Sequence, residues 1–374
     1  MGQGWILTRG ARVFGAFVCA VLGLISFAWI VRDLGDADES NHLWWTWAGL
    51  PYRSSGGVFG SSLIDLVLLI LCLFAGVAAL RSSAAAGALA GVALVSIVYR
   101  LPSLWNLSAD WMQGIPEGLK TKAQLSTWAG VLLGVALLLA LAVARRPAGA
   151  ADDQGHGDGY GQRHGDGYGP GYGQGYGAPA LQQPPDRPGS GAATTGALVL
   201  GAVAAIACAW QLYWAEKLEW EMYKRLLTGE RALNTLLSPP GAWSAWATAA
   251  LALFAAVAAG ARTAHARPLG MTVGLVVLAM GVSDVSRFVK LDVIEHWDEL
   301  PTPGQLTVLT AFFEIAAGLV VLAVMAARGT QPGGPRPGAG WAGPAAGWAP
   351  PVSPAPPVAP PPSAPPPPSA PPGW

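Results

Sequence analysis

The sequence predicts an all-α integral membrane protein in which eight transmembrane helices form two tandem four-helix units in parallel orientation, with a disordered linker and tail. Three observations predict this fold. The 374-residue chain is 52% hydrophobic and only 12% charged, whereas soluble domains average about 25% charged residues. Eight apolar stretches approach the length that crosses a hydrocarbon core of about 30 Å. Several short motifs of the first half recur, in the same order, in the second half.

The eight helices are predicted from apolar runs of about 20 residues, the length that a spanning helix needs. The first run is long for the hydrophobic region of a signal peptide, and no small-residue cleavage site follows it, so we expect an uncleaved helix. The third and seventh runs are the shortest. The predicted helices cover Val13–Val31, Val58–Leu80, Ser83–Tyr99, Thr127–Ala144, Ala193–Trp214, Trp243–Gly260, Leu269–Val285 and Leu306–Ala327.

Arginines between the helices predict the orientation, because cytoplasmic loops are enriched in Lys and Arg. With the N-terminus inside, the inner segments carry arginines and no acid before the central linker, although some arginines and all lysines lie on the outer side. We expect a multi-pass protein of the cell (plasma) membrane with cytoplasmic N- and C-termini. The inner arginines are Arg9, Arg12, Arg81, Arg145, Arg146, Arg262, Arg267 and Arg328.

Tryptophans gather on the proposed outer side. An indole has an apolar body and one N–H donor, so it settles at the boundary between water and lipid. We therefore expect an interfacial belt, with a ligand cage as the alternative. A segment on the same side, Ala215–Leu237, has apolar residues at helical spacing and predicts an amphipathic helix that lies on the outer surface or caps the bundle. The outer tryptophans are Trp44, Trp45, Trp47, Trp105, Trp111, Trp214, Trp243 and Trp297.

An internal repeat divides the chain. GAFVCAVLGLISFAW at Gly15–Trp29 matches GALVLGAVAAIACAW at Gly196–Trp210, and CLFAGVAAL at Cys72–Leu80 matches ALFAAVAAG at Ala252–Gly260. We infer a tandem duplication. Because four helices return the chain to its starting side, both copies have the same orientation. The predicted parts are a first membrane unit at 1–147, a Gly/Tyr-rich cytoplasmic linker at 148–192, a second membrane unit at 193–330 and a Pro-rich cytoplasmic tail at 331–374.

The linker and the tail have compositions that are typical of disorder, since neither can bury enough apolar surface to fold. The linker contains HGDGYG twice. We favour a flexible tether; the alternative interpretation is a metal site at His156 and His164. Proline excludes helix and sheet from the tail. The tail is expected to be a spacer; the alternative is docking of PPPSAPPPPSAPP in the aromatic-lined groove of a protein partner.

Six glycines at four-residue spacing indicate helix packing. In lipid, apolar side chains gain nothing by leaving one apolar solvent for another, so helices associate where small residues let the backbones approach. The pairs do not reveal whether they pack within a copy, between copies or between chains. These glycines are Gly87, Gly91, Gly130, Gly134, Gly270 and Gly274.

Acids within spanning helices are expensive and are functional hypotheses by default. Glu314 is predicted near the bilayer midplane and Asp65 nearer the outer surface; a proton or cation relay is one interpretation of both. The alternative is a hydrogen bond to a neighbour, from Thr310 for Glu314 and from a preceding serine for Asp65. Asp284 has Arg287 one turn later and predicts an ion pair near the interface.

Other chemistry is not indicated. The three cysteines, Cys19, Cys72 and Cys208, lie in apolar runs and are expected to be buried thiols rather than disulfides or zinc ligands. Net charge is zero, so no basic field attracts nucleic acid. No P-loop, nucleophile elbow, HExxH or dinucleotide fingerprint is present. We expect no cofactor, no metal and no enzyme activity.

In its Ala/Gly bias, its use of Arg rather than Lys at the inner face and its Pro-rich tail, the chain resembles uncharacterised multi-pass membrane proteins of high-GC actinobacteria. The resemblance is one of composition and implies no functional residue. The favoured function is partner binding or envelope organisation without catalysis. The alternative is a small-solute or proton-coupled transporter or channel that uses Glu314 and Asp65. The oligomeric state does not follow from the sequence.

Overall fold

Ten α-helices, two short 3₁₀ helices and two short strands form the part of the chain that the computed structural model describes, namely residues 5–52, 57–82, 84–112, 114–147, 187–231 and 234–327. The predicted tail, and the predicted linker before residue 187, lie outside these residues. The elements are β1 (Trp5–Leu7), α1 (Arg9–Asp36), α2 (Ser40–Trp47), α3 (Leu63–Arg81), α4 (Ala85–Asn106), η1 (Asp110–Met112), α5 (Glu117–Val143), β2 (Arg145–Pro147), α6 (Ser190–Lys217), α7 (Trp220–Thr228), α8 (Gly241–Gly260), α9 (Ala266–Lys290), η2 (Trp297–Glu299) and α10 (Thr302–Ala326).

Eight of these helices are long and apolar enough to cross a membrane; they are α1, α3, α4, α5, α6, α8, α9 and α10. Their outward faces carry large apolar side chains, such as Phe74, which is 73% exposed, and Leu198, which is 69% exposed. Exposed apolar area on this scale is a liability in water, whereas lipid tails solvate it as well as a protein core does. The chain is an integral membrane protein with the predicted eight spans.

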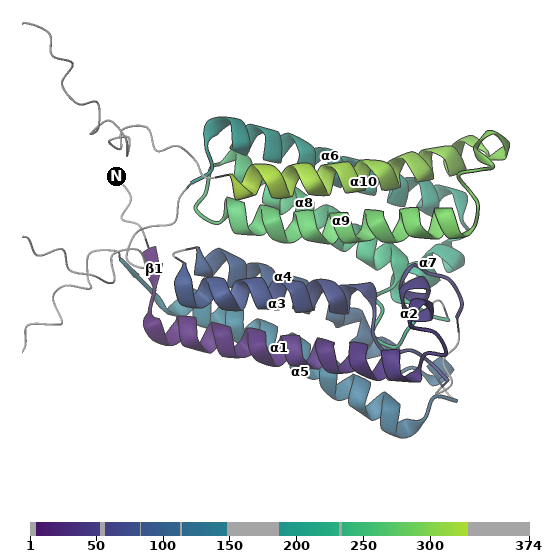
Figure 1. Ribbon diagram of the computed structural model, residues 1–374, viewed down its shortest axis with the longest axis horizontal. Helices are drawn as coiled ribbons and strands as arrows, with labels where there is room; N and C mark the ends of the chain where they lie inside the picture. The colour runs from purple at the N-terminus through teal and green to yellow at the C-terminus, as the bar shows by residue number, and fades with distance from the viewer. Residues whose placement is uncertain are drawn as a thin grey trace, which may run out of the picture. The chain divides into compact units, whose positions relative to one another are not determined.

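The spanning helices form two quartets with the same packing order. In the first quartet, α1 packs on α3, α3 on α4, α4 on α5, and α5 returns to α1. In the second quartet, α6, α8, α9 and α10 make the corresponding four contacts. Figure 1 shows the quartets as two groups of helices, with α4 and α3 facing α9. The fold is the predicted pair of four-helix units.

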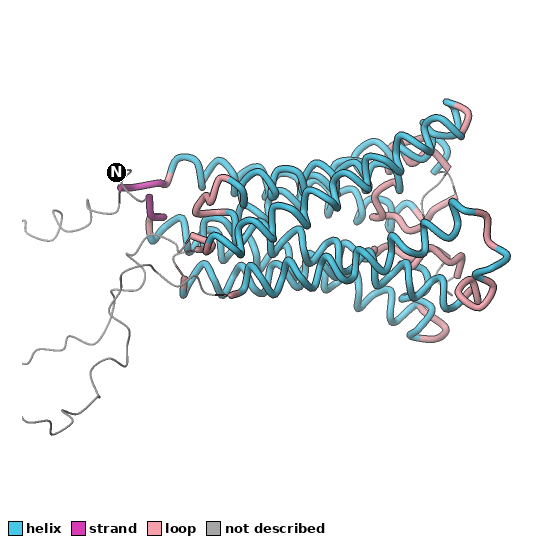
Figure 2. Tube along the Cα trace, turned by 90° about the horizontal axis from the view of Figure 1, so that it is seen from above, coloured by secondary structure: helices cyan, strands magenta, loops and turns pink. Residues whose placement is uncertain are grey.

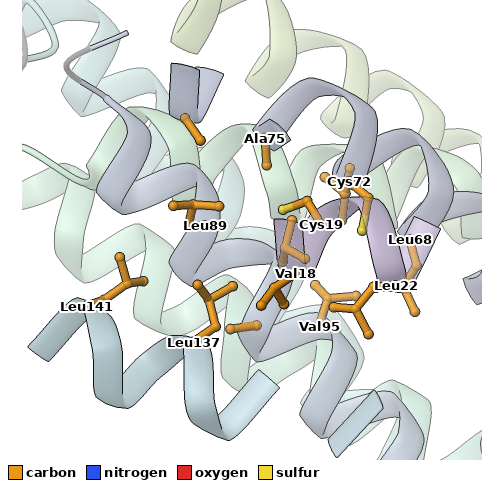
Figure 3. Close-up of a cluster of buried hydrophobic side chains, with 14 of the residues drawn as sticks. Val18, Cys19, Leu22, Leu68, Cys72, Ala75, Leu89, Val95, Leu137 and Leu141 are labelled. Carbon is orange, nitrogen blue, oxygen red and sulfur yellow. The ribbon is translucent and has the colours of Figure 1, made fainter. Parts of the chain in front are cut away.

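The core of the first quartet contains two cysteines. Cys19 of α1 and Cys72 of α3 are both buried free thiols, and both belong to one cluster of buried side chains. Figure 3 shows the two sulfur atoms within a shell of valine and leucine side chains. These two cysteines act as small core residues, as the sequence predicts.

The quartets meet through α3 and α4 on one side and α8 and α9 on the other. Close approach occurs at Gly87 and Gly91 of α4, which lie against Pro268 and Thr272 of α9. Towards the other end of α4, the buried Tyr99 hydroxyl lies 2.8 Å from the Thr248 hydroxyl of α8. The quartets therefore share a packed, hydrogen-bonded interface.

Helix ends differ from the predicted bounds for local reasons. The second span begins at Leu63 rather than Val58, because Ser62 caps it: the backbone N–H of Ser62 donates to Asp65, and the side chain of Ser62 accepts from the first turn. The third span runs beyond the predicted Tyr99 to Asn106 and contains Pro102. Proline lacks an N–H, so its helix loses one backbone hydrogen bond.

We name the two ends of the bundle according to the predicted orientation. The outer end carries α2 and α7, and the inner end carries β1, which pairs with β2 in antiparallel register. Figure 2 shows the two strands together at one end of the helices. At the inner end, Arg267 donates to the terminal carbonyls of α10, those of Met325, Ala326 and Ala327. A cation at a helix C-terminus also complements the helix dipole.

Candidate functional site

Both quartets build one structure at the outer end. We define the outer cap as α2, α7, residues 57–62 and residues 234–240. The backbone N–H of Leu236 donates to the carbonyl of Phe59 at 3.1 Å, and that of Leu237 donates to the carbonyl of Gly60 at 3.0 Å. These bonds join the loop before α3 to the loop before α8, so the corresponding loops of the two quartets form one surface.

Two indoles strengthen the cap. Pro102 leaves the carbonyl of Val98, four residues earlier, without its helical partner, and the Nε1–H of Trp243 donates to that carbonyl at 2.9 Å. The Nε1–H of Trp105 donates to the carbonyl of Thr228 at 2.8 Å, and the two indole rings are in edge contact. Two of the tryptophans that predicted an interfacial belt thus bind one quartet to the other.

The predicted amphipathic helix at Ala215–Leu237 is wrong in its extent. The spanning helix α6 continues to Lys217, and α7 ends at Thr228 because Gly229 adopts a positive φ of 88°. The buried residue of α7 is Tyr223, whose hydroxyl donates to Gln211 and accepts from the indole of Trp246. The apolar spacing located a capping helix, but the glycine that ends it divides the segment.

A polar cleft of about 120 Å³ lies within the outer cap. Its walls come from both quartets and are rich in hydroxyl groups. The volume has room for several water molecules or for one small polar group. The polar lining residues are Thr46, Ser62, Asn234, Thr235, Ser238 and Ser244.

One lining group is buried without a partner. The Oγ1 atom of Thr235 makes no hydrogen bond within the described part of the chain, although the residue is only 3% exposed. A buried hydroxyl without a partner costs free energy comparable to a lost hydrogen bond. A ligand with a donor or an acceptor would recover that free energy, so Thr235 points to the cleft as a binding site.

The floor of the cleft connects to a buried ion pair. Ser62 lines the cleft and donates its hydroxyl to Asp65 at 3.0 Å. The other carboxylate oxygen of Asp65 accepts from the guanidinium of Arg100, and both side chains are almost fully buried. Asp65 therefore has a helix-capping serine and an arginine as partners. This arrangement matches the structural alternative for Asp65 and adds an arginine that sequence reasoning did not assign to it.

More buried polar groups follow Arg100 along α4. Arg100, Ser103 and Asn106 lie on successive turns, and Thr127 of α5 lies one turn from Gly130, which packs on Arg100. Each of the four polar residues has one atom without a hydrogen-bond partner among the described residues. The first quartet therefore contains a polar strip that begins at the Asp65–Arg100 pair and runs toward the outer end.

Asp33 is a second buried acid, which the sequence does not single out. It lies in the last turn of α1 and is fully buried. Its carboxylate accepts from the backbone N–H groups of Gly60 and Ser61 and from the Ser61 hydroxyl, and it pairs with Arg32. No local sequence signal reveals its burial, because the donors Gly60 and Ser61 lie more than 25 residues away in the sequence.

Glu314 has a different environment. It is half-buried in the middle of α10, and no hydrogen bond or ion pair of the described residues includes its carboxylate. The expected bond to Thr310 is absent, because that hydroxyl donates to Leu306 and accepts from the indole of Trp210. Glu314 packs on Gly281 of α9, one turn from Asp284, and Asp284 pairs with Arg287 at 2.9 Å, the ion pair that the spacing predicts.

The six predicted packing glycines fall into two sets. Gly87 and Gly91 pack between the quartets, as described above. The other four pack within a quartet: Gly130 and Gly134 of α5 lie against α4, and Gly270 and Gly274 of α9 lie against α10. All six lie in helix–helix contacts inside one chain.

No protein-family model, curated protein or solved structure matches this chain. Among the described residues, no three His, Cys, Asp or Glu side chains form a group that could hold a metal ion. The metal alternative for His156 and His164 lies outside the described residues. The candidate site is therefore defined by its own geometry: a polar cleft that both quartets form, above a buried ion pair.

Proposed function

We propose that this chain is a non-enzymatic protein of the plasma membrane that binds a partner through its outer cap. The observation that carries the proposal is the polar cleft, with the unpartnered hydroxyl of Thr235 in its wall. The lining offers uncharged donors and acceptors, so it suits a neutral polar group, such as a hydroxyl or an amide of the partner.

The rigidity of the cap supports a binding role. The backbone bonds between the two loops and the indole bonds between the quartets fix both walls of the cleft. A preformed site loses less conformational entropy when its ligand binds. The absence of a catalytic motif from the sequence favours binding over catalysis.

The orientation forms part of the proposal. Arginine-rich inner segments favour a cytoplasmic inner end, which places both termini in the cytoplasm and the cap on the opposite side of the plasma membrane. A partner of the cap would then be an extracytoplasmic molecule or an extracytoplasmic segment of another membrane protein.

Site-specific photo-crosslinking in cells tests the proposal. A photoreactive residue at Asn234, which is exposed and lines the cleft, should give a discrete adduct. The same probe at the lipid-facing Val257 serves as the control. Ser244→Leu, which fills the cleft, should abolish the adduct, and Ser286→Leu, on the surface of α9, should keep it. Identical adducts at Asn234 and Val257, or no adduct at Asn234, would refute cap binding.

A second candidate is a small-solute or proton-coupled transporter, and one observation favours it. Glu314 lies in mid-helix with no hydrogen-bond partner among the described residues and packs on Gly281 of α9, one turn from the acid Asp284, and acids within spanning helices are common at proton-relay sites. Asp65 does not support this candidate, because Ser62 and Arg100 occupy both of its oxygens. Flux into liposomes that contain the purified protein, and its loss in Glu314→Gln, would favour transport over binding alone.

A further inference from the structure

An apolar groove lies between the quartets in the inner half of the bundle, beside the close contact of Gly87 and Gly91 with α9. Its volume is about 670 Å³. It lies between α3 and α4 of the first quartet and α9 and α10 of the second; Figure 1 shows α3 and α4 facing α9. The walls include Leu71, Phe74 and Ala78 of α3, Met271 and Leu275 of α9, and Leu322 of α10.

The groove has the length of one lipid leaflet. Its lining along α3 extends from Leu71 to Ser82, which at 1.5 Å per residue is about 16 Å. Half of a hydrocarbon core is about 15 Å thick. Phe74, at the groove wall, is 73% exposed, so the groove opens toward the region that acyl chains occupy.

Two guanidinium groups lie at the inner end of the groove. Arg267 lines it; within the described residues, Arg267 donates only to the carbonyls that end α10 and makes no ion pair with an acid. Arg12 donates to the carbonyl of Ser82, another lining residue. The apolar slot therefore ends in positive charge at the depth where lipid phosphates lie.

Charge and shape together identify the occupant. A neutral apolar molecule would leave the charge of Arg267 without an anion, and a soluble phosphate would leave the apolar walls unused. An anionic phospholipid satisfies both, because its acyl chain fills the slot and its phosphate lies beside the guanidinium. Basic pockets between spanning helices bind anionic headgroups by this principle.

We propose that the groove between the quartets is a binding site for an anionic phospholipid, with one acyl chain along α3 and α9 and the phosphate at Arg267. The bound lipid lies beside the contact of α4 with α9 and touches both quartets. This site is distinct from the outer cap, and the proposal does not depend on the function of the cap.

Native mass spectrometry of the full-length protein, titrated with phosphatidylglycerol or with phosphatidylcholine, tests the proposal. Wild-type protein should prefer phosphatidylglycerol by about fivefold, the effect of one interfacial arginine. Arg267→Gln should remove the preference, whereas Arg225→Gln, on the exposed face of α7, should keep it. Equal binding of the two lipids by wild-type protein, or a preference that survives Arg267→Gln, would overturn the proposal.

Arg267→Gln also removes the hydrogen bonds that Arg267 donates to the carbonyls at the end of α10. A second pair of variants therefore keeps Arg267 and changes only the groove or a position outside it. Ala78→Trp places a large side chain in the groove and leaves Arg267 unchanged, so it should reduce binding of phosphatidylglycerol. Val257→Trp adds the same side chain to a lipid-facing position outside the groove and should have no effect. Undiminished binding in Ala78→Trp would show that the lipid lies elsewhere.

Discussion

The two quartets share one packing order but differ in how they treat charge. In the first quartet, Asp33 and Asp65 are fully buried, and each accepts hydrogen bonds from several donors and pairs with an arginine. In the second quartet, Glu314 lies in mid-helix with no hydrogen-bond partner among the described residues and packs on Gly281 of α9, one turn from Asp284. The buried acids of the first quartet thus have structural partners, whereas in the second quartet Asp284 pairs with Arg287 and Glu314 has no partner among the described residues.

The comparison indicates what holds the scaffold together. The predicted repeat aligns Asp33 with Trp214, Asp65 with Ala245 and Glu314 with Gly130, so none of these acids has a counterpart in the other copy. Close glycine contacts, in contrast, occur between the last two helices of both quartets. We infer that small-residue packing maintains the common architecture, and that the charges serve purposes specific to each quartet.

Breaking the Asp65–Arg100 pair should have the largest effect on stability. Arg100→Leu leaves a buried carboxylate without its cation, and the free energy of unfolding should fall by about 3–5 kcal/mol. Thermal unfolding in detergent measures the loss, with the exposed Arg225→Leu as the control. The double variant Asp65→Asn/Arg100→Leu should recover part of it. A loss no greater than that of Arg225→Leu would show that the pair is not structural.

Removal of the Asp33 carboxylate should have the next largest effect. Asp33→Ala leaves the N–H groups of Gly60 and Ser61 without their acceptor, at a cost of about 2–3 kcal/mol. Because these residues belong to the outer cap, hydrogen exchange of residues 57–62 should accelerate. The exposed Asp38→Ala is the matched control. Unchanged exchange in Asp33→Ala would exclude Asp33 from the support of the cap.

A smaller difference should separate two equivalent glycines. An added Cβ at Gly318 of α10 would lie 2.8 Å from the backbone oxygen of Gly274, so α9 and α10 must move apart. At Gly134 of α5, the nearest backbone oxygen lies at 3.2 Å, and the closest atom belongs to the Ile97 side chain, which can rotate. Gly318→Ala should destabilise by about 1–2 kcal/mol and Gly134→Ala by less. Equal thermal unfolding midpoints would contradict this ranking.

The smallest effect on stability is expected for Glu314. Glu314→Gln removes no hydrogen bond within the described residues and avoids any cost of a charge in lipid, so the unfolding midpoint should stay the same or rise. The measurement distinguishes the two quartets, because the corresponding neutral variant Asp65→Asn should lower the midpoint. A clear loss of stability in Glu314→Gln would mean that this acid is also structural.

The sequence predicts the architecture better than the site, for physical reasons. Hydrocarbon thickness fixes the length of apolar runs, so all eight spans are visible without coordinates, and capping residues such as Ser62 shift only their ends. The cleft is different, because its walls come from Thr46, Ser62 and Thr235, which are far apart in the chain. Asp33 illustrates the same limit. Its hydrogen-bond donors, Gly60 and Ser61, are distant in the sequence, so nothing near Asp33 reveals that the acid is buried.

The central claim is that two parallel quartets cross the membrane and join at a single outer cap. Labelling of single cysteines with a membrane-impermeant reagent tests it most directly. In a chain that lacks the native cysteines, one cysteine at a time replaces Asn41 before α3, Glu221 before α8 or Ala264 before α9. The account predicts that Asn41 and Glu221 react from the outside of intact cells and that Ala264 reacts only after the membrane is opened. Reaction of Asn41 and Glu221 from opposite sides would contradict it.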